Sequence, residues 1–386
     1  MKLKLWQLLY IVGFVIVLSL IVFEAIGFHL PANTLALTEL IGGILLIAGS
    51  CEAFVLSVEG IAHNMKLTDY VAGIYASLAS TIPELVLIAF LLIRGQYEMA
   101  WVLALATIFM NSLVFALYTL VLPKHEDGNY KLPDAINRVG SDLLSMGAVI
   151  SLAVGLSMMI VYLFSIDDAH LLTARSLSSG ELIVFGICLL GVFVAYLYRI
   201  TKYFGKVEPE SEDPLMSGEV HHPKMSQKTV VIFVVLASLG ALLGGEALAN
   251  FANFAIDTLQ LNMIHAALLL VIFGGTPEYI IVASSHRKDQ LEIALSNAFG
   301  GIVQVFFVIF GFTLIASGIL GWITTGGTAV IPIDLASLIL LVFAFPSMFM
   351  LRVMITDDSK VNALESVSMI AVFVMMLYIL LAYGIY

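Results

Sequence analysis

Two short stretches bring a carboxylate and a proline together inside apolar sequence, at Ser80–Glu84 and Gly274–Glu278. A carboxylate inside a membrane segment is costly unless it binds a partner, a proton or a cation. Proline also lacks an N–H, so the carbonyls of Ala79 and Phe273, four residues earlier, lose their helical donor. The two stretches lie 194 residues apart. This duplication favours two halves of one cation site over two carboxylic acids held protonated in a helix bundle.

Oxygen atoms close to each carboxylate could complete such a site. Two carboxylates balance the charge of one divalent cation, and Ca²⁺ takes about six to eight oxygen ligands. The Ser80 and Thr81 hydroxyls lie on the Glu84 side of a helix, where they could bind the cation or bond back to the backbone. The second half has Gly274 and Gly275 at these positions, which allow either close backbone approach or tight helix packing.

Polar amides occur in the middle of the following apolar segments. Asn111 comes 27 residues after Glu84, and Gln304 comes 26 residues after Glu278. Such amides often connect helices by hydrogen bonds. Their spacing predicts that they also face the carboxylates as ligands.

Glu52 and Glu246 form a second pair of acids at the same separation. Each could be a proton relay, an outer ligand or part of a cation vestibule, or a polar anchor between helices. Cys51 and Cys188 both lie in apolar segments and are interpreted as packing residues rather than a disulfide or metal pair.

The segments that carry these residues define an integral membrane protein. The chain has 386 residues, of which 61% are hydrophobic and 12% charged. The apolar segments are long enough to cross a bilayer as helices, and no strand-like alternation of a barrel is present. The sequence therefore predicts an all-α polytopic fold with 11 transmembrane helices. They cover 5–27, 38–63, 68–93, 97–121, 139–165, 179–203, 228–258, 262–285, 289–317, 332–355 and 362–385.

The distribution of basic residues predicts the orientation. With a cytoplasmic N-terminus, only Arg94 and Arg175 of the 17 Lys and Arg residues fall outside. An odd helix count then puts the C-terminus on the opposite side. In a prokaryote the membrane would be the cell (inner) membrane.

A shift of 194 residues superposes two stretches of the chain, one from each half, without a gap. It aligns Glu52 with Glu246 and Pro83-Glu84 with Pro277-Glu278. Five helices per half make the repeats inverted, an arrangement typical of alternating-access transporters. The predicted parts are an N-terminal helix (1–37), the first repeat (38–203), a linker (204–227) and the second repeat (228–386). The acidic cytoplasmic linker could be a solvated connection or a regulatory sensor of cations or pH.

The chain resembles the Ca²⁺/cation antiporter superfamily over residues 38–385. That superfamily has inverted repeats centred on G-T-S-x-P-E or G-N-x-x-E motifs, to which Ser80–Glu84 and Gly274–Glu278 are similar. Neither stretch has the asparagine after the first glycine. The one-plus-five-plus-five layout, the acidic linker and the 300–304 stretch, similar to G-S-x-x-Q, look like the cation/proton exchangers. The Ser80–Glu84 stretch looks more like the Na⁺/Ca²⁺ branch, which often has a polar ligand where Val305 stands here.

Physical chemistry favours protons as the coupling ion. Protons compete with a cation for carboxylates in a low-dielectric site, and two protons balance the same charge as one Ca²⁺. Several Na⁺ ions would need more ligands than the sequence offers. We therefore expect a secondary Ca²⁺/H⁺ antiporter with the site at the membrane midplane. The alternative is a Na⁺/Ca²⁺ exchanger, and a more distant one is a cation channel.

The same features predict which partners the protein has. The partners are Ca²⁺, the coupling cation and the bilayer, with no nucleic acid and no cofactor. An enzyme is not expected, since the chain has no His-Glu-x-x-His and no Gly-x-Gly-Asp motif of an intramembrane hydrolase.

Overall fold

The computed structural model describes residues 4–123, 129–132, 140–164, 176–204, 225–287, 291–326, 331–332, 335–357 and 359–383. Within this part of the chain, 11 helical segments are long and apolar enough to cross a membrane. The predicted all-α polytopic fold and its segment count are therefore confirmed. Most of the linker predicted at 204–227 lies outside the described residues.

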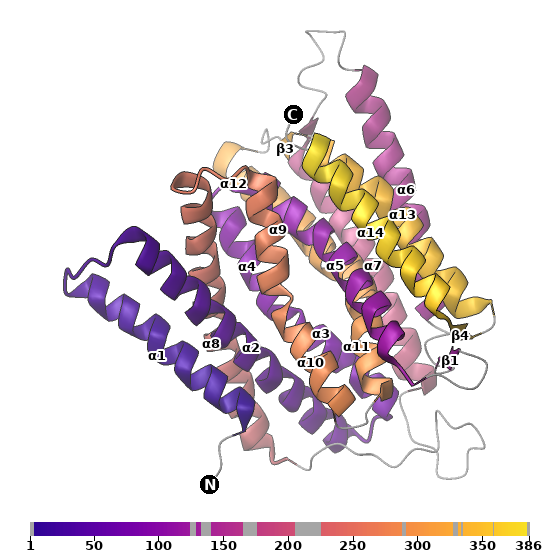
Figure 1. The fold of residues 1–386 in the computed structure, drawn as a ribbon, viewed down its shortest axis with the longest axis horizontal. Helices are drawn as coiled ribbons and strands as arrows, with labels where there is room; N and C mark the ends of the chain where they lie inside the picture. Colours follow the sequence, from indigo (N-terminus) through magenta and orange to yellow (C-terminus); the bar gives the residue numbers. More distant parts are fainter. Residues whose placement is uncertain are drawn as a thin grey trace. The chain divides into compact units, whose positions relative to one another are not determined.

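Figure 1 labels the helices along the chain. They belong to two compact units. Unit 1 comprises Met1–Leu91 and Arg199–Gly300, and unit 2 comprises Leu92–Tyr198 and Gly301–Tyr386. Each unit therefore takes helices from both halves of the chain. The repeats predicted at 38–203 and 228–386 are defined by matching sequence positions and not by these packing units, so they stay a prediction.

Seven helices lie largely in unit 1. They are α1 (Leu5–Ala25), α2 (Ala32–Met65), α3 (Asp69–Ser80), α4 (Ile82–Ile93), α8 (Gln227–Asp257), α9 (Met263–Gly274) and α10 (Thr276–Arg287). Helix α11 (Leu291–Gln304) begins in this unit. Helix α2 packs extensively on both α1 and α8. It crosses α8 at Gly43 and Gly244, where a Cβ on either glycine would lie 3.1 Å from the other's carbonyl oxygen. Small residues at such a crossing bring two helix backbones close together.

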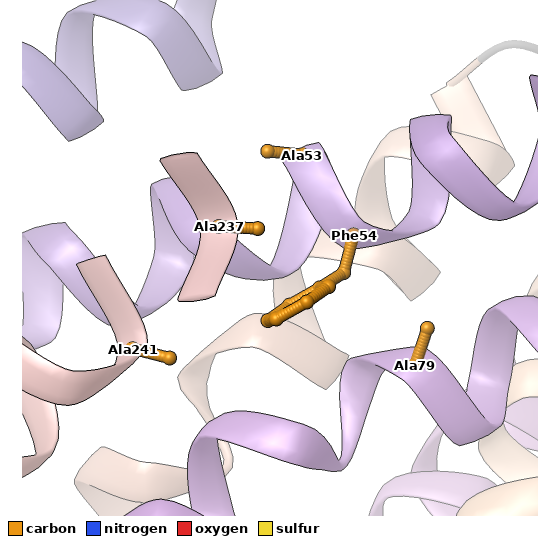
Figure 2. Packing of buried hydrophobic residues seen from close by; sticks show 5 residues of the cluster. All are labelled: Ala53, Phe54, Ala79, Ala237 and Ala241. Atoms are coloured by element: carbon orange, nitrogen blue, oxygen red, sulfur yellow. The ribbon is translucent and has the colours of Figure 1, made fainter. Parts of the chain in front are cut away.

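A cluster of alanines around one aromatic ring packs the interior of unit 1. The Phe54 ring of α2 lies between Ala237 and Ala241 of α8 on one side and Ala79 of α3 on the other (Figure 2). All are buried, and Trp6 of α1 packs against the same cluster. The helix that ends at the first Pro-Glu stretch is thus fixed against α2 and α8.

Unit 2 contains the remaining helices and two short strand pairs. The helices are α5 (Tyr97–Val121), α6 (Ser141–Phe164), α7 (Ser179–Phe204), the π-helix η3 (Val305–Phe310), α12 (Gly311–Thr325), α13 (Leu335–Thr356) and α14 (Ala363–Tyr383). The strands are β1 (Tyr130–Lys131), β2 (Ser176–Leu177), β3 (Ile331–Pro332) and β4 (Lys360–Val361). The π-helix follows α11 directly, and α5 packs against η3, α13 and α14.

The strand pairs connect loops that the predicted topology puts on the same side. Strand β1, after α5, pairs antiparallel with β4, before α14. Strand β2, after α6, pairs antiparallel with β3, before α13. If α6 and α13 each cross the membrane once, the two pairs lie on opposite sides, as alternating crossings require.

Candidate cation-binding site

Two of the membrane segments are broken at equivalent positions. Helix α3 ends at Ser80 and α4 begins at Ile82, with Thr81 between them. Helix α9 ends at Gly274 and α10 begins at Thr276, with Gly275 between them. All four helices have 12 residues, and a shift of 194 residues superposes every one of their ends. The sequence predicted each of these two segments as a single apolar helix whose backbone hydrogen bonds a proline interrupts. The structure instead separates each segment into two half-length helices.

The prolines account for these breaks. Pro83 and Pro277 lie at the second position of the new helices, where a missing N–H costs little. The N–H of Thr81 turns back toward the carbonyls of Leu78 and Ala79, and that of Gly275 toward Val271 and Phe273. The carbonyls of Ala79 and Phe273 thus face a break rather than a continuing helix, and each keeps a lone pair that could bind a cation.

Glu84 and Glu278 occupy the first turns of α4 and α10. A helix N-terminus carries a partial positive charge, which stabilises a carboxylate there. The ends of α3 and α9 at the same breaks carry partial negative charge, which favours a cation. Each break therefore combines one favourable position for a carboxylate with one for a metal ion.

The two carboxylates lie within electrostatic reach of each other inside unit 1. Glu84 is 7% exposed and Glu278 is 4% exposed. The Oε2 atom of Glu84 is buried and has no hydrogen-bond partner among the described residues. Two buried like charges repel each other, so a cation or protons must neutralise the pair.

The hydroxyls predicted as ligands lie at the first break. Ser80 and Thr81 are buried. Ser80 Oγ donates to the carbonyl of Ser77 at 2.6 Å, and Thr81 Oγ1 donates to that of Leu78 at 2.8 Å. Each hydroxyl thus bonds back to the backbone, but its oxygen keeps lone pairs that could still bind a cation. Gly274 and Gly275 are buried at the second break.

Helix α2 brings Glu52 toward the pair. Cys51 is buried and lies within electrostatic reach of Glu52, Glu84 and Glu278. Helix α2 also contacts both α9 and α10. Glu52, the residue after Cys51, is partly buried.

Glu246 has different surroundings. It is exposed and lines a cavity of about 300 Å³ between α1, α2 and α8, together with Glu39 and Asn250. Asn250 Nδ2 donates to Glu39 Oε1 at 2.8 Å. The two acids that match in sequence therefore differ in surroundings, and their role in a proton path stays a prediction.

Asn111 and Gln304 are both buried in unit 2, each 2% exposed. The Nδ2 atom of Asn111 has no hydrogen-bond partner in the described part of the chain. Gln304 is the last residue of α11, where the helix changes to the π-helix η3. Such π-helical turns occur often at functional sites. The position of Asn111 and Gln304 opposite the carboxylates stays a prediction.

The donor set indicates which metal ions could bind. Across the described residues, no group of three or more His, Cys, Asp or Glu side chains could hold a metal ion. Glu84 and Glu278 would have to be completed by hydroxyl and carbonyl oxygens. An all-oxygen set of this kind suits hard cations such as Ca²⁺ rather than zinc or copper.

Tyr279 lies beside the two carboxylates and was not singled out from the sequence. It follows Glu278, and its hydroxyl lies within electrostatic reach of Glu278 and Glu84. The hydroxyl oxygen is buried and has no hydrogen-bond partner among the described residues. The signal in the sequence was its phenol at the position where the first half has Leu85.

The fold and the site define a multi-pass α-helical membrane protein whose paired carboxylates lie at two equivalent helix breaks. A family model described as "Sodium/calcium exchanger protein" matches residues 35–202 and 229–382. The chain belongs to this family, and the resemblance to Ca²⁺/cation antiporters is confirmed. The search of curated proteins found no match.

Solved structures with the same fold include exchangers of two kinds. The H⁺/Ca²⁺ exchanger CAX matches with a TM-score of 0.69 and 14% identity, over 97% of this chain and 88% of that chain. The protein YfkE matches with a TM-score of 0.62 and 16% identity, over 97% and 98%. The sodium-calcium exchanger NCX_Mj matches with a TM-score of 0.54 and 15% identity, over 89% and 98%. At these identities the likeness concerns the fold.

Proposed function

We propose that this protein is a secondary active antiporter that exchanges Ca²⁺ for protons, with Glu84 and Glu278 binding both ions. The observation that carries the proposal is the burial of these two interacting carboxylates at equivalent helix breaks. One Ca²⁺ neutralises the pair, and so do two protons. The site can therefore bind either one Ca²⁺ or two protons without leaving a net buried charge.

The further ligands in this proposal are oxygens at the breaks. They are the hydroxyls of Ser80 and Thr81 and the carbonyls released near Ala79 and Phe273. Gly274 and Gly275 leave the second break open to close approach by the backbone. Asn111 and Gln304 would add amide oxygens.

Alternating access supplies the transport step. Helix ends that match at a shift of 194 residues support two structural repeats, and an odd number of crossings per repeat would invert them. The strand pairing in unit 2 supports alternating crossings. The basic residues support a cytoplasmic N-terminus. Exchange requires that the protein change its open side only when the carboxylates are neutralised.

Protons are preferred to Na⁺ as the coupling ion because of the ligand count. Several Na⁺ ions would need further acidic or polar groups, and Val305 is a buried apolar residue where related exchangers often have one. Na⁺ remains the second candidate because the hydroxyl pair at Ser80 and Thr81 resembles the sodium-coupled branch. A channel is distinguished from both by the absence of countertransport.

The proposal is tested with purified protein in liposomes loaded with Ca²⁺. We expect an inward proton gradient, but not an inward Na⁺ gradient, to drive Ca²⁺ efflux that saturates with Ca²⁺ concentration. Proton movement in the opposite direction is followed with a pH-sensitive dye. Efflux driven only by Na⁺ would overturn the proton coupling, and efflux without any counter-ion movement would overturn antiport. Liposomes without protein are the control for passive Ca²⁺ leakage.

A further inference from the structure

The second helix break has no side-chain hydroxyl at the positions where the first break has two. Gly274 and Gly275 correspond to Ser80 and Thr81. If the halves supplied ligands only from equivalent positions, the second half would contribute fewer oxygens. The surroundings of Gly275 show what takes the place of a side chain there.

The phenol of Tyr279 occupies the space that a side chain on Gly275 would fill. A Cβ atom built on Gly275 would lie 2.5 Å from Tyr279 Oη and 2.9 Å from Tyr279 Cζ. A Cβ atom essentially never approaches another atom so closely, so a side chain at position 275 has no room while the hydroxyl stays here. Tyr279 lies one helical turn after Gly275, and its N–H donates to the Gly275 carbonyl at 3.3 Å. The ring thus folds back over the break.

The hydroxyl at this place is buried and available. Tyr279 Oη has no hydrogen-bond partner in the described part of the chain, and neither does Glu84 Oε2. The phenol lies within electrostatic reach of Glu278 and of Glu84. Burying an unpartnered hydroxyl costs free energy unless a ligand satisfies it. The equivalent residue in the first half, Leu85, offers no oxygen.

We propose that Tyr279 is a cation-binding and specificity-determining residue, whose phenol oxygen replaces at the second break the hydroxyl that Thr81 provides at the first. The inference rests on the proposed site at Glu84 and Glu278. The ligand is a hard cation, Ca²⁺, which binds oxygen ligands, and a neutral phenol has an oxygen lone pair to offer. The exchange of Thr81 and Leu85 for Gly275 and Tyr279 moves one hydroxyl by one helical turn and keeps it at the break.

The test measures Ca²⁺ binding by isothermal titration calorimetry on the full chain purified in detergent, with CaCl₂ as the titrant at fixed pH. Tyr279→Phe keeps the ring and removes only the oxygen, and we expect it to raise the Kd for Ca²⁺ by about tenfold. Thr81→Ala should raise it by a similar factor. Thermal unfolding of each variant checks that the fold is retained.

A double variant moves the hydroxyl back to the position used in the first half. Gly275→Ser with Tyr279→Leu gives the second break a hydroxyl where the first has Thr81 and a leucine where it has Leu85, and we expect a Kd within about threefold of the wild type. Tyr279→Leu alone should bind as weakly as Tyr279→Phe. Gly275→Ser alone should also weaken binding, because its side chain would collide with the phenol.

Two results would overturn the inference. One is an unchanged Kd in Tyr279→Phe, which would mean that the ring only packs. The other is a double variant no better than Tyr279→Leu. Glu84→Gln, titrated in parallel, separates the failures. If it still binds Ca²⁺, the proposed site itself is wrong. If it does not bind while Tyr279→Phe binds normally, only the role of Tyr279 is wrong.

Discussion

Lys66 and Gln260 share a left-handed backbone conformation, with φ of 55° and 53°, although 194 residues separate them. Non-glycine residues rarely adopt this conformation. The two residues follow α2 and α8, and each precedes one of the broken helices. The same rare backbone conformation thus precedes both candidate half-sites, which supports a common origin for the two halves.

The first prediction concerns the carboxylates. Glu84→Gln and Glu278→Gln each remove one charge at nearly constant volume, leaving a pair that can no longer neutralise Ca²⁺. We expect each variant to lose Ca²⁺/H⁺ exchange in liposomes by at least about 100-fold, while it still elutes as a folded protein in size-exclusion chromatography. Glu98→Gln, at the first turn of α5, is the control and should keep most of the activity. Normal exchange by both site variants would contradict the assignment.

The second prediction concerns pH. Ca²⁺ and protons compete for the same two carboxylates, so lowering the pH on the Ca²⁺-binding side should raise the apparent KM for Ca²⁺. With two protons displaced per Ca²⁺, the rise approaches about 100-fold per pH unit where both carboxylates are protonated, and vanishes where both are ionised. Initial rates of Ca²⁺ uptake at clamped internal pH give this dependence. An apparent KM independent of external pH, together with Na⁺-driven uptake, would favour the sodium-coupled alternative.

The membrane fold could be predicted from sequence because long apolar segments and basic loops are strong signals. Glu84 and Glu278 could be chosen as candidates in the same way, since acidic residues are rare inside apolar segments. The position of Tyr279 could not be predicted, because it depends on a side chain folding back over a glycine one turn away. The π-helix after Gln304 was also missed, since its residues are apolar throughout.

The third prediction concerns the helix starts that precede the two breaks. Thr68 Oγ1 accepts from the N–H of Val71, and Asn262 Oδ1 accepts from that of Ile264 at 2.7 Å. These caps occupy equivalent positions in the two halves. Thr68→Ala and Asn262→Ala should each lower the free energy of unfolding by about 1 kcal/mol. Thermal unfolding in detergent measures the loss, and Thr68→Ser, which keeps the cap, should be close to the wild type. Unchanged stability in both alanine variants would mean that water replaces these caps without cost.

The last prediction concerns the contact of α1 with α2 and α8. Tyr10 of α1 donates its hydroxyl to the carbonyl of Leu236 at 2.7 Å, and its ring lies on Gly240. A Cβ atom on Gly240 would overlap Ser50 Oγ and would lie 2.5 Å from Tyr10 Cε2. Because these neighbours belong to packed helices, the added methyl group must displace one of them.

Gly240→Ala should therefore destabilise the protein by about 1–3 kcal/mol, the usual cost of an overpacked core. Gly73→Ala in α3 is the matched control, because a Cβ there would meet nothing within 4 Å. Alanine has the higher helix propensity, so the control should be neutral or more stable by about 0.5–1 kcal/mol. Opposite shifts of the unfolding temperature in the two variants are the expected result. Equal shifts of the unfolding temperature would show that α1 moves to make room for the methyl group, and that it does not hold α2 and α8 at a fixed distance.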